Sequence, residues 1–237
     1  MDTENETLHI EDGMLHIDGM SAAELVARHG TPLYVLSRSA LAKRIAELRT
    51  DVLDRYPNTR AAYASKAFLC IAMCEIIEEE GLALDVVSGG ELYTAMKAGF
   101  PAERIEFHGN NKLPEELEMA IGYGVGRIII DAPDELRIIE EIAARQGRKP
   151  SILFRINPEV EANTHTHIST GFKGSKFGFA PDGEQTLALL AAASASEHVD
   201  LLGIHCHVGS QLFDKDSHLG ALATMLHTIK EARDQLG

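Results

Sequence analysis

Short apolar segments recur along this chain at a nearly constant interval, and each is followed by a segment with helical periodicity. The first five begin at residues 61, 82, 105, 127 and 152, so their starts lie 21 to 25 residues apart. Strands that alternate with helices in this way form a parallel sheet covered by helices. Such a short and regular interval favours a barrel over a doubly wound sheet.

The expected strands cover residues 61–64, 82–87, 105–108, 127–131, 152–156 and 201–205. A complete eight-stranded barrel takes about 250 residues, whereas this chain of 237 residues reaches only its sixth regular strand. The sequence therefore predicts an α/β fold over residues 39–237, a (β/α)8 TIM barrel that is incomplete at its C-terminus. Residues 1–38 are expected to form a separate segment, and the rest of the protein is expected to follow Gly237.

The charge and the cysteine content of the chain limit which partners it can bind and where in the cell it is expected. With 36 acidic and 22 basic side chains, the chain carries a net charge of −14, which disfavours nucleic acids and anionic membranes as partners. The N-terminus is acidic where a signal peptide would be basic and then apolar, so a cytoplasmic location is expected. Cys70, Cys74 and Cys206 are odd in number and form no C-x-x-C pair, which argues against a disulfide framework or a zinc knuckle.

Lys66 is the first candidate for chemistry. If residues 61–64 form a strand, Ala62, Ala64 and Lys66 share one face, and the lysine lies at the carboxyl end of the strand. Barrel enzymes carry their active sites at that end. A partly desolvated lysine amine there can attack a carbonyl group and form a Schiff base. The alternative is an ordinary solvated lysine.

The segment 203–211 holds two histidines and a possible phosphate site. His205 and His207 face the same way on a strand, so they could bind a metal ion together or stack on a flat cofactor. For His205 a hydrogen-bonded core histidine is the favoured interpretation. Gly209 and Ser210 then offer backbone N–H groups and a hydroxyl just before a helix, where phosphates are commonly held.

Two charged side chains lie inside apolar strands and therefore need partners. Asp85 is expected to pair with a cation inside the barrel, for which Lys66 is the simplest choice. Arg155 needs an acidic or phenolate partner. The pair Gly89 and Gly90 matches no dinucleotide or Walker motif, so a tight turn into the next helix is expected there.

Five motifs in order resemble the diaminopimelate decarboxylase family, which belongs to the alanine-racemase-like class of pyridoxal-phosphate (PLP) enzymes. They are Tyr63-Ala64-Ser65-Lys66-Ala67, Asp85-Val86-Val87-Ser88-Gly89-Gly90-Glu91-Leu92, Phe107-His108-Gly109-Asn110-Asn111-Lys112, Ser169-Thr170-Gly171 with Ser175-Lys176-Phe177-Gly178, and His205-Cys206-His207-Val208-Gly209-Ser210-Gln211. The resemblance runs from about Leu33 to the C-terminus.

This resemblance implies PLP as the cofactor and assigns a role to each candidate. It implies that Lys66 holds the cofactor covalently, that Asp85 lies near this lysine, and that His207 stacks on the pyridine ring. Further cofactor contacts are implied for Arg155 at the phenolate oxygen and for Gly209 and Ser210 at the phosphate.

The implied reaction converts meso-2,6-diaminoheptanedioate to L-lysine and CO₂, the last step of lysine biosynthesis. The family also has a β-rich second domain, to which residues 1–38 are expected to belong or on which they are expected to pack. The complete protein is expected to be a homodimer. A chain ending at Gly237 lacks several of the family's active-site segments, so it is expected to be inactive alone.

Three alternatives stay open. One is a related PLP-dependent decarboxylase acting on ornithine, arginine or carboxynorspermidine. Another is a non-catalytic PLP-binding paralogue that regulates an active partner. The third is a metal-dependent barrel hydrolase, in which His165 or His167, from the long loop 157–178, would join His205 and His207 as a third ligand.

Overall fold

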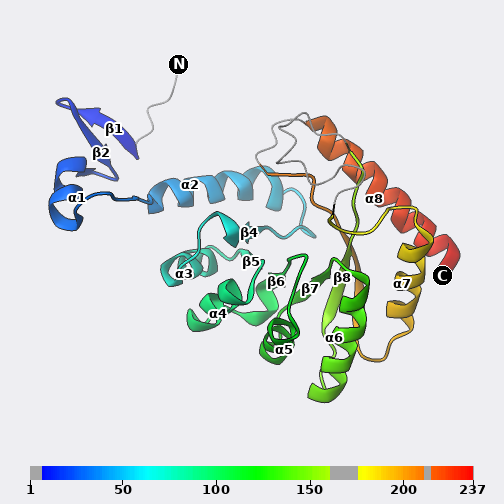
Figure 1. Cartoon of the computed structure of the whole chain (residues 1–237). Coiled ribbons are helices and arrows are strands. Elements are labelled where there is room, and N and C mark those ends of the chain that lie inside the picture. Colours follow the sequence, from blue (N-terminus) through cyan, green and yellow to red (C-terminus); the bar gives the residue numbers. More distant parts are fainter. Residues whose placement is uncertain (1–6, 161–175, 211–214, 237) are drawn as a thin grey trace. The chain divides into compact units, whose positions relative to one another are not determined.

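The computed structural model describes residues 7–160, 176–210 and 215–236 (Figure 1). The chain divides into two compact units, Met1–Ala61 and Ala62–Gly237. Most of the loop 157–178, including His165 and His167, lies outside the described residues.

The first unit contains a small antiparallel sheet and two helices. Its elements are β1 (Leu8–Glu11), β2 (Met14–Ile17), β3 (Met20–Ser21), α1 (Ala22–His29) and α2 (Arg38–Leu48), which continues into a π-helical turn, η1 (Arg49–Leu53). Asp12 and Gly13 join β1 to β2 with φ values of 48° and 76°, as a two-residue hairpin turn requires. The side chain of Ser21 accepts a hydrogen bond from the backbone of Glu24 and so begins α1.

The second unit is built on a six-stranded parallel sheet, and this confirms the predicted α/β fold. Its strands are β4 (Ala62–Ala64), β5 (Ala83–Val86), β6 (Ile105–Phe107), β7 (Arg127–Ile130), β8 (Ser151–Arg155) and β9 (Asp200–His205). They pair in sequence order from β4 to β9. Within the described residues, β4 and β9 are the two edges of the sheet, so the barrel is not closed.

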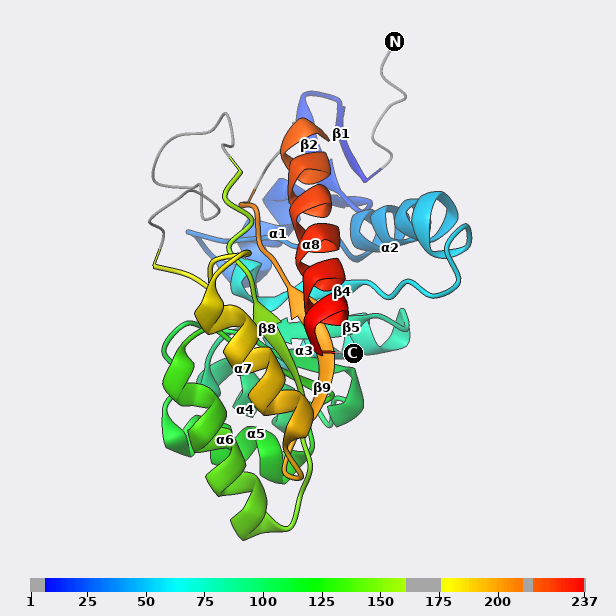
Figure 2. The same cartoon turned by 90° about the vertical axis from the view of Figure 1, so that its right-hand side faces the viewer.

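Helices alternate with these strands and cover the sheet (Figures 1 and 2). They are α3 (Ile71–Glu79), α4 (Gly89–Lys97), α5 (Pro114–Tyr123), α6 (Pro133–Gln146), α7 (Glu184–Ala195) and α8 (Lys215–Leu236), with short 3-10 turns at η2 (Ser65–Ala67) and η3 (Ala102–Arg104). Figure 2 shows α7 and α8 next to β9, and both helices contact that strand.

Local sequence signals explain where these elements begin and end. Proline occupies the first position of α5 and α6, where the missing N–H costs nothing, and Gly124 and Gly147 end the same helices in the left-handed conformation. The strand β7 reads Arg-Ile-Ile-Ile, and its three isoleucines are at most 1% exposed. Such continuous apolar runs are typical of parallel strands that are buried on both faces.

No helix in the described part of the chain combines the length and the apolar character that crossing a bilayer would require.

Candidate active site

A cavity of about 320 Å³ lies at the carboxyl-terminal edge of the parallel sheet. Side chains from five strands or the turns that follow them line it: Lys66, Asp85, His108, Arg155, His205 and His207. Parallel strands bring their carboxyl ends to one edge, so residues up to 141 positions apart in sequence meet there. The size falls within the range of small-molecule sites.

Lys66 lies in the turn η2, directly after β4. Lys66 is exposed and lines the cavity, whereas the preceding Ser65 is buried. This placement agrees with the strand-end position predicted for the lysine. Its amine is therefore accessible to a molecule that enters the cavity.

The basic side chain closest to Asp85 is a histidine and not Lys66, the partner that was expected. The Oδ1 atom of Asp85 lies 3.6 Å from Nε2 of His108, and this oxygen is buried without a hydrogen-bond partner. Burial raises the pKa of Asp85, while the charges of His108 and Lys66 oppose that rise. Lys66 thus acts on Asp85 through its charge at longer range, and the closest basic side chain to Asp85 is that of His108, which immediately follows β6.

Arg155 has the acidic partner that its position in a strand requires. Its guanidinium lies 2.7 Å from Oδ2 of Asp131, and the other oxygen of Asp131 accepts a hydrogen bond from the backbone of Gly178 at 2.9 Å. The guanidinium also stacks over the ring of Phe177, 4.4 Å from its centroid. These contacts hold Arg155 in one orientation at the floor of the cavity.

A buried lysine supports the wall of the cavity, and sequence analysis assigned it no role. The Nζ atom of Lys112 donates to the carbonyl oxygens of Gly109 and Ile129, at 2.6 and 2.7 Å, and lies 3.1 Å from Glu135. Glu135 in turn accepts a hydrogen bond from the backbone of Asp131 at 2.8 Å. This network links the loop after β6 to the loop after β7 and to the start of α6.

His205 and His207 both face the cavity, and their neutral forms are favoured. Burial, followed by the charges around it, lowers the pKa of His205 to about 3, and its Nδ1 atom is buried without a hydrogen-bond partner. The expectation of a hydrogen-bonded core histidine is therefore wrong, because the ring packs edge-on against His108, with centroids 4.7 Å apart. Burial and the charges of Lys66 and Arg155 lower the pKa of His207 to about 4.

The remaining candidates lie at or beyond the margin of the cavity. Gly209 has a φ of 151°, and Ser210 is exposed. Neither lines the cavity. Cys70, Cys74 and Cys206 are free thiols, and burial raises the pKa of Cys74 to about 11. Cys74 is fully buried in the core.

The donor set of the cavity fits a planar, anionic carbonyl cofactor. Lys66 offers an amine that can bond to a carbonyl carbon, Arg155 offers a fixed cation, and His207 offers an uncharged ring. The buried oxygen of Asp85 that lacks a hydrogen-bond partner is available to a donor from a bound molecule.

The parallel β/α sheet, with the amine of Lys66 in a cavity at its carboxyl edge, defines the class of the protein as an α/β fold whose site suits a carbonyl compound. Residues 42–237 match the family described as pyridoxal-dependent decarboxylase, pyridoxal binding domain. The chain belongs to this family, and its cofactor is PLP.

Within this family, the chain is similar to curated proteins of one particular activity. The chain is 45% identical to a diaminopimelate decarboxylase of Bacillus subtilis over 224 residues, and 44% identical to that of Bacillus methanolicus over 226 residues. These alignments cover 94% and 95% of this chain but 51% and 52% of the relatives. The chain thus spans about half the length of the curated relatives it matches.

A solved structure agrees with the sequence comparison. The diaminopimelate decarboxylase of M. jannaschii, in complex with L-lysine, superposes with a TM-score of 0.89 at 35% identity. The match covers 98% of this chain and 54% of that protein.

Proposed function

We propose that this chain is the PLP-binding part of a diaminopimelate decarboxylase, which converts meso-2,6-diaminoheptanedioate to L-lysine and CO₂. One observation carries the proposal: Lys66, Asp85, Arg155 and His207 line one cavity at the carboxyl edge of the sheet. The similar proteins named diaminopimelate decarboxylase, and the one solved with L-lysine, support the choice of substrate.

Each side chain of the cavity has a role in this proposal. Lys66 would hold the cofactor covalently through its amine, and Asp85 would keep a negative charge near that amine. His207 would pack against the cofactor ring, and Arg155 would approach its phenolate oxygen. Gly209 and Ser210 would bind the phosphate. When bound, PLP supplies the ring that accepts the electron pair left by the departing CO₂.

Two cations of the cavity could contact anionic groups of a bound molecule. Because the low pKa values of His205 and His207 keep both rings neutral near pH 7, the positive charge comes from Lys66 and Arg155. Arg155 keeps its charge in a buried place because Asp131 pairs with it. The amine of Lys66 and the guanidinium of Arg155 could contact anionic groups of the cofactor or the substrate directly, although Asp85 and Asp131 offset their charge.

The proposal extends to domains, assembly and location. Residues 39–237 would form the PLP-binding barrel, and residues 1–38, which contain β1, β2 and β3, would belong to the β-rich second domain or pack on it. The complete protein would be a homodimer, as the family resemblance implies. The three free thiols fit a reducing compartment, which supports a cytoplasmic location.

Covalent labelling tests the cofactor site. The purified chain is incubated with PLP, reduced with borohydride, and digested for peptide mass spectrometry. We expect the pyridoxyl label on Lys66 and no label in a Lys66→Ala variant. A Lys97→Ala variant is the matched control, because Lys97 is also exposed but lies over Tyr93, outside the cavity. Label spread over many lysines, with none concentrated on Lys66, would contradict the proposed site.

Turnover tests the substrate separately. The full-length protein should release CO₂ from meso-2,6-diaminoheptanedioate much faster than from ornithine, arginine or carboxynorspermidine. Faster turnover of one of the other amino acids would overturn the substrate assignment while leaving the PLP site intact. Labelled Lys66 without turnover of any of them would favour a non-catalytic paralogue.

A further inference from the structure

One face of the hairpin formed by β1 and β2 carries an unusual set of side chains. The pairing places His9 opposite His16, and Glu11 lies two residues after His9 on the same face. The opposite face is apolar and holds Leu8, Ile10, Leu15 and Ile17. The two histidines and the carboxylate therefore gather on one side of a short sheet in the first unit.

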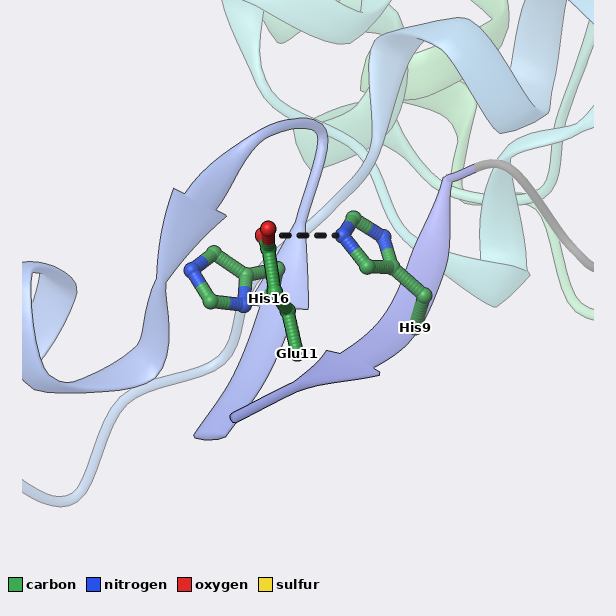
Figure 3. Close-up of side chains that lie close together, drawn as sticks. All are labelled: His9, Glu11 and His16. Atoms are coloured by element: carbon green, nitrogen blue, oxygen red, sulfur yellow. Dashed lines mark ion pairs between the residues drawn. The ribbon is translucent and has the colours of Figure 1, made fainter. Parts of the chain in front are cut away.

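These three side chains converge closely (Figure 3). One ligand atom from each of His9, Glu11 and His16 lies within 4.8 Å of the other two. Nε2 of His9 is 3.9 Å from Oε2 of Glu11, and the two imidazole rings stack with centroids 5.3 Å apart and an interplanar angle of 13°. In the described part of the chain, no other group of three histidine, cysteine or carboxylate side chains is this compact.

The ring of His16 contacts a backbone carbonyl oxygen. Nδ1 of His16 lies 3.1 Å from the carbonyl oxygen of Met14, and a carbonyl can only accept. In the tautomer of His16 that donates from Nδ1 to this oxygen, Nε2 keeps its lone pair for an ion. Metal-binding histidines are held by the same arrangement, in which one ring nitrogen donates to an oxygen and the other binds the ion.

We propose that His9, Glu11 and His16 form a binding site for a zinc ion that links β1 to β2. Two imidazole nitrogens and one carboxylate oxygen are a known zinc ligand set, with water in the fourth position. The side chains of His9 and Glu11 are 39% and 67% exposed, so an ion and its water can enter directly. The three ligand atoms, which lie within 4.8 Å of one another, would close to the ~3.4 Å separation of a zinc tetrahedron when the ion binds.

A metal ion at this position would stabilise the first unit. Among the described residues of the first unit, Ile45 is the only buried apolar side chain. A small hairpin without a substantial core is marginally stable by itself, and small units commonly depend on a metal ion or another cross-link. A zinc ion held by both strands would favour the paired state of β1 and β2 over the separated state.

Calorimetric titration with zinc chloride tests the site in the complete chain. We expect the wild type to bind one zinc ion more tightly than either a His16→Ala or a Glu11→Gln variant, by at least about tenfold. His227→Ala is the matched control, because His227 pairs with Glu231 at 3.8 Å on α8 but lacks a third ligand. This control should retain the zinc affinity of the wild type.

Histidine NMR of the wild type makes the test independent of how the variants fold. Zinc should shift the ring signals of His9 and His16 together, at one equivalent, while the signals of His227 stay unchanged. Equal zinc affinity in the wild type and the His16→Ala variant would overturn the proposal. Ring signals of His9 and His16 that do not respond to zinc would overturn it as well.

Discussion

Lys112 is the only buried lysine in the described part of the chain, and its burial depends on its partners. Burial lowers the pKa of this amine, and the charge of Glu135 opposes the shift. A Lys112→Met variant should lose about 3 kcal/mol of unfolding free energy, because it leaves Glu135 buried without a cation. Urea unfolding followed by circular dichroism measures the loss.

The double variant Lys112→Met, Glu135→Gln is the control for this prediction. It removes both charges, so part of the lost stability should return. If the single and the double variant were equally unstable, the ion pair would not be the cause, and the loss would come from the two carbonyl oxygens that Lys112 binds.

His205 gives a prediction about pH. Because its pKa falls from 6.5 to about 3 on folding, the unfolded chain binds a proton between these values that the folded chain does not bind. The free energy of unfolding therefore decreases as the pH falls below about 6.5, by about 2 kcal/mol from this residue at about pH 5. Urea unfolding across this pH range should show the decrease.

A His205→Gln variant separates this effect from other titrating groups. The difference between wild type and variant should depend on pH over this range, while contributions from Asp85 and the other carboxylates largely cancel. A difference that is constant from about pH 7 to 5 would contradict a neutral, partly buried His205.

Sequence reasoning at the scale of residues identified side chains more readily than their partners. Lys66, Asp85, Arg155 and His207 stood out because each is a polar residue within or just after an apolar strand, and all four line the cavity. Their partners were harder to predict: Asp85 lies close to His108, and His205 packs in the cavity wall. Which side chains meet across neighbouring strands depends on register and rotamer, and neither is written in the local pattern.

At the scale of elements, the start of α4 shows how two adjacent glycines differ. A Cβ atom on Gly89 would lie 2.8 Å from Oε1 of Glu116, whereas a Cβ on Gly90 would meet only the hydroxyl of Ser88, at 3.8 Å. Glu116 accepts hydrogen bonds from the backbone N–H groups of Gly89, at 2.5 Å, and of Leu113, at 2.8 Å. The absence of a side chain at Gly89 therefore leaves room for the Glu116 side chain to reach the start of α4.

Alanine substitutions at these two positions should have different effects. Gly89→Ala should destabilise the chain by about 1–2 kcal/mol, because Glu116 must move and lose hydrogen bonds. Gly90→Ala should be neutral or stabilising by up to about 1 kcal/mol, since alanine is the better helix former. Thermal and urea unfolding of both variants would check this, and equal destabilisation would argue against the close approach of Glu116.

The six parallel strands were predictable because several signals agree. Each predicted range overlaps the observed strand, with ends that differ by no more than one or two residues. Apolar runs, glycine turns and helical periodicity repeat at one interval, so each strand–helix repeat supports the assignment of the next. The hairpin of β1 and β2 was missed, although Asp12-Gly13 is a typical hairpin turn, because its strands are short and stand outside the repeat.

At the scale of the whole molecule, the parallel order of the strands explains why the cavity lies at one edge of the sheet. It also explains why the sheet should be more stable than the first unit. Strands β5 to β8 lie between neighbours on both sides, and their side chains are largely buried. The first unit has one buried apolar residue, Ile45, within its described part. Buried apolar surface is the main source of folding free energy, so the two units should open at very different rates.

Hydrogen exchange measured by mass spectrometry tests this division of stability. Without zinc and in the presence of a chelator, peptides from β1 and β2 should exchange on the order of a hundredfold faster than peptides from β5 to β8, relative to their intrinsic rates. The hairpin belongs to a separate three-stranded sheet, whereas exposing the amides of β7 requires both neighbouring strands to separate. Equal protection in the two units would mean that they unfold as one cooperative body. In that case the hairpin would owe its stability to the rest of the chain, and a zinc ion would add little to it.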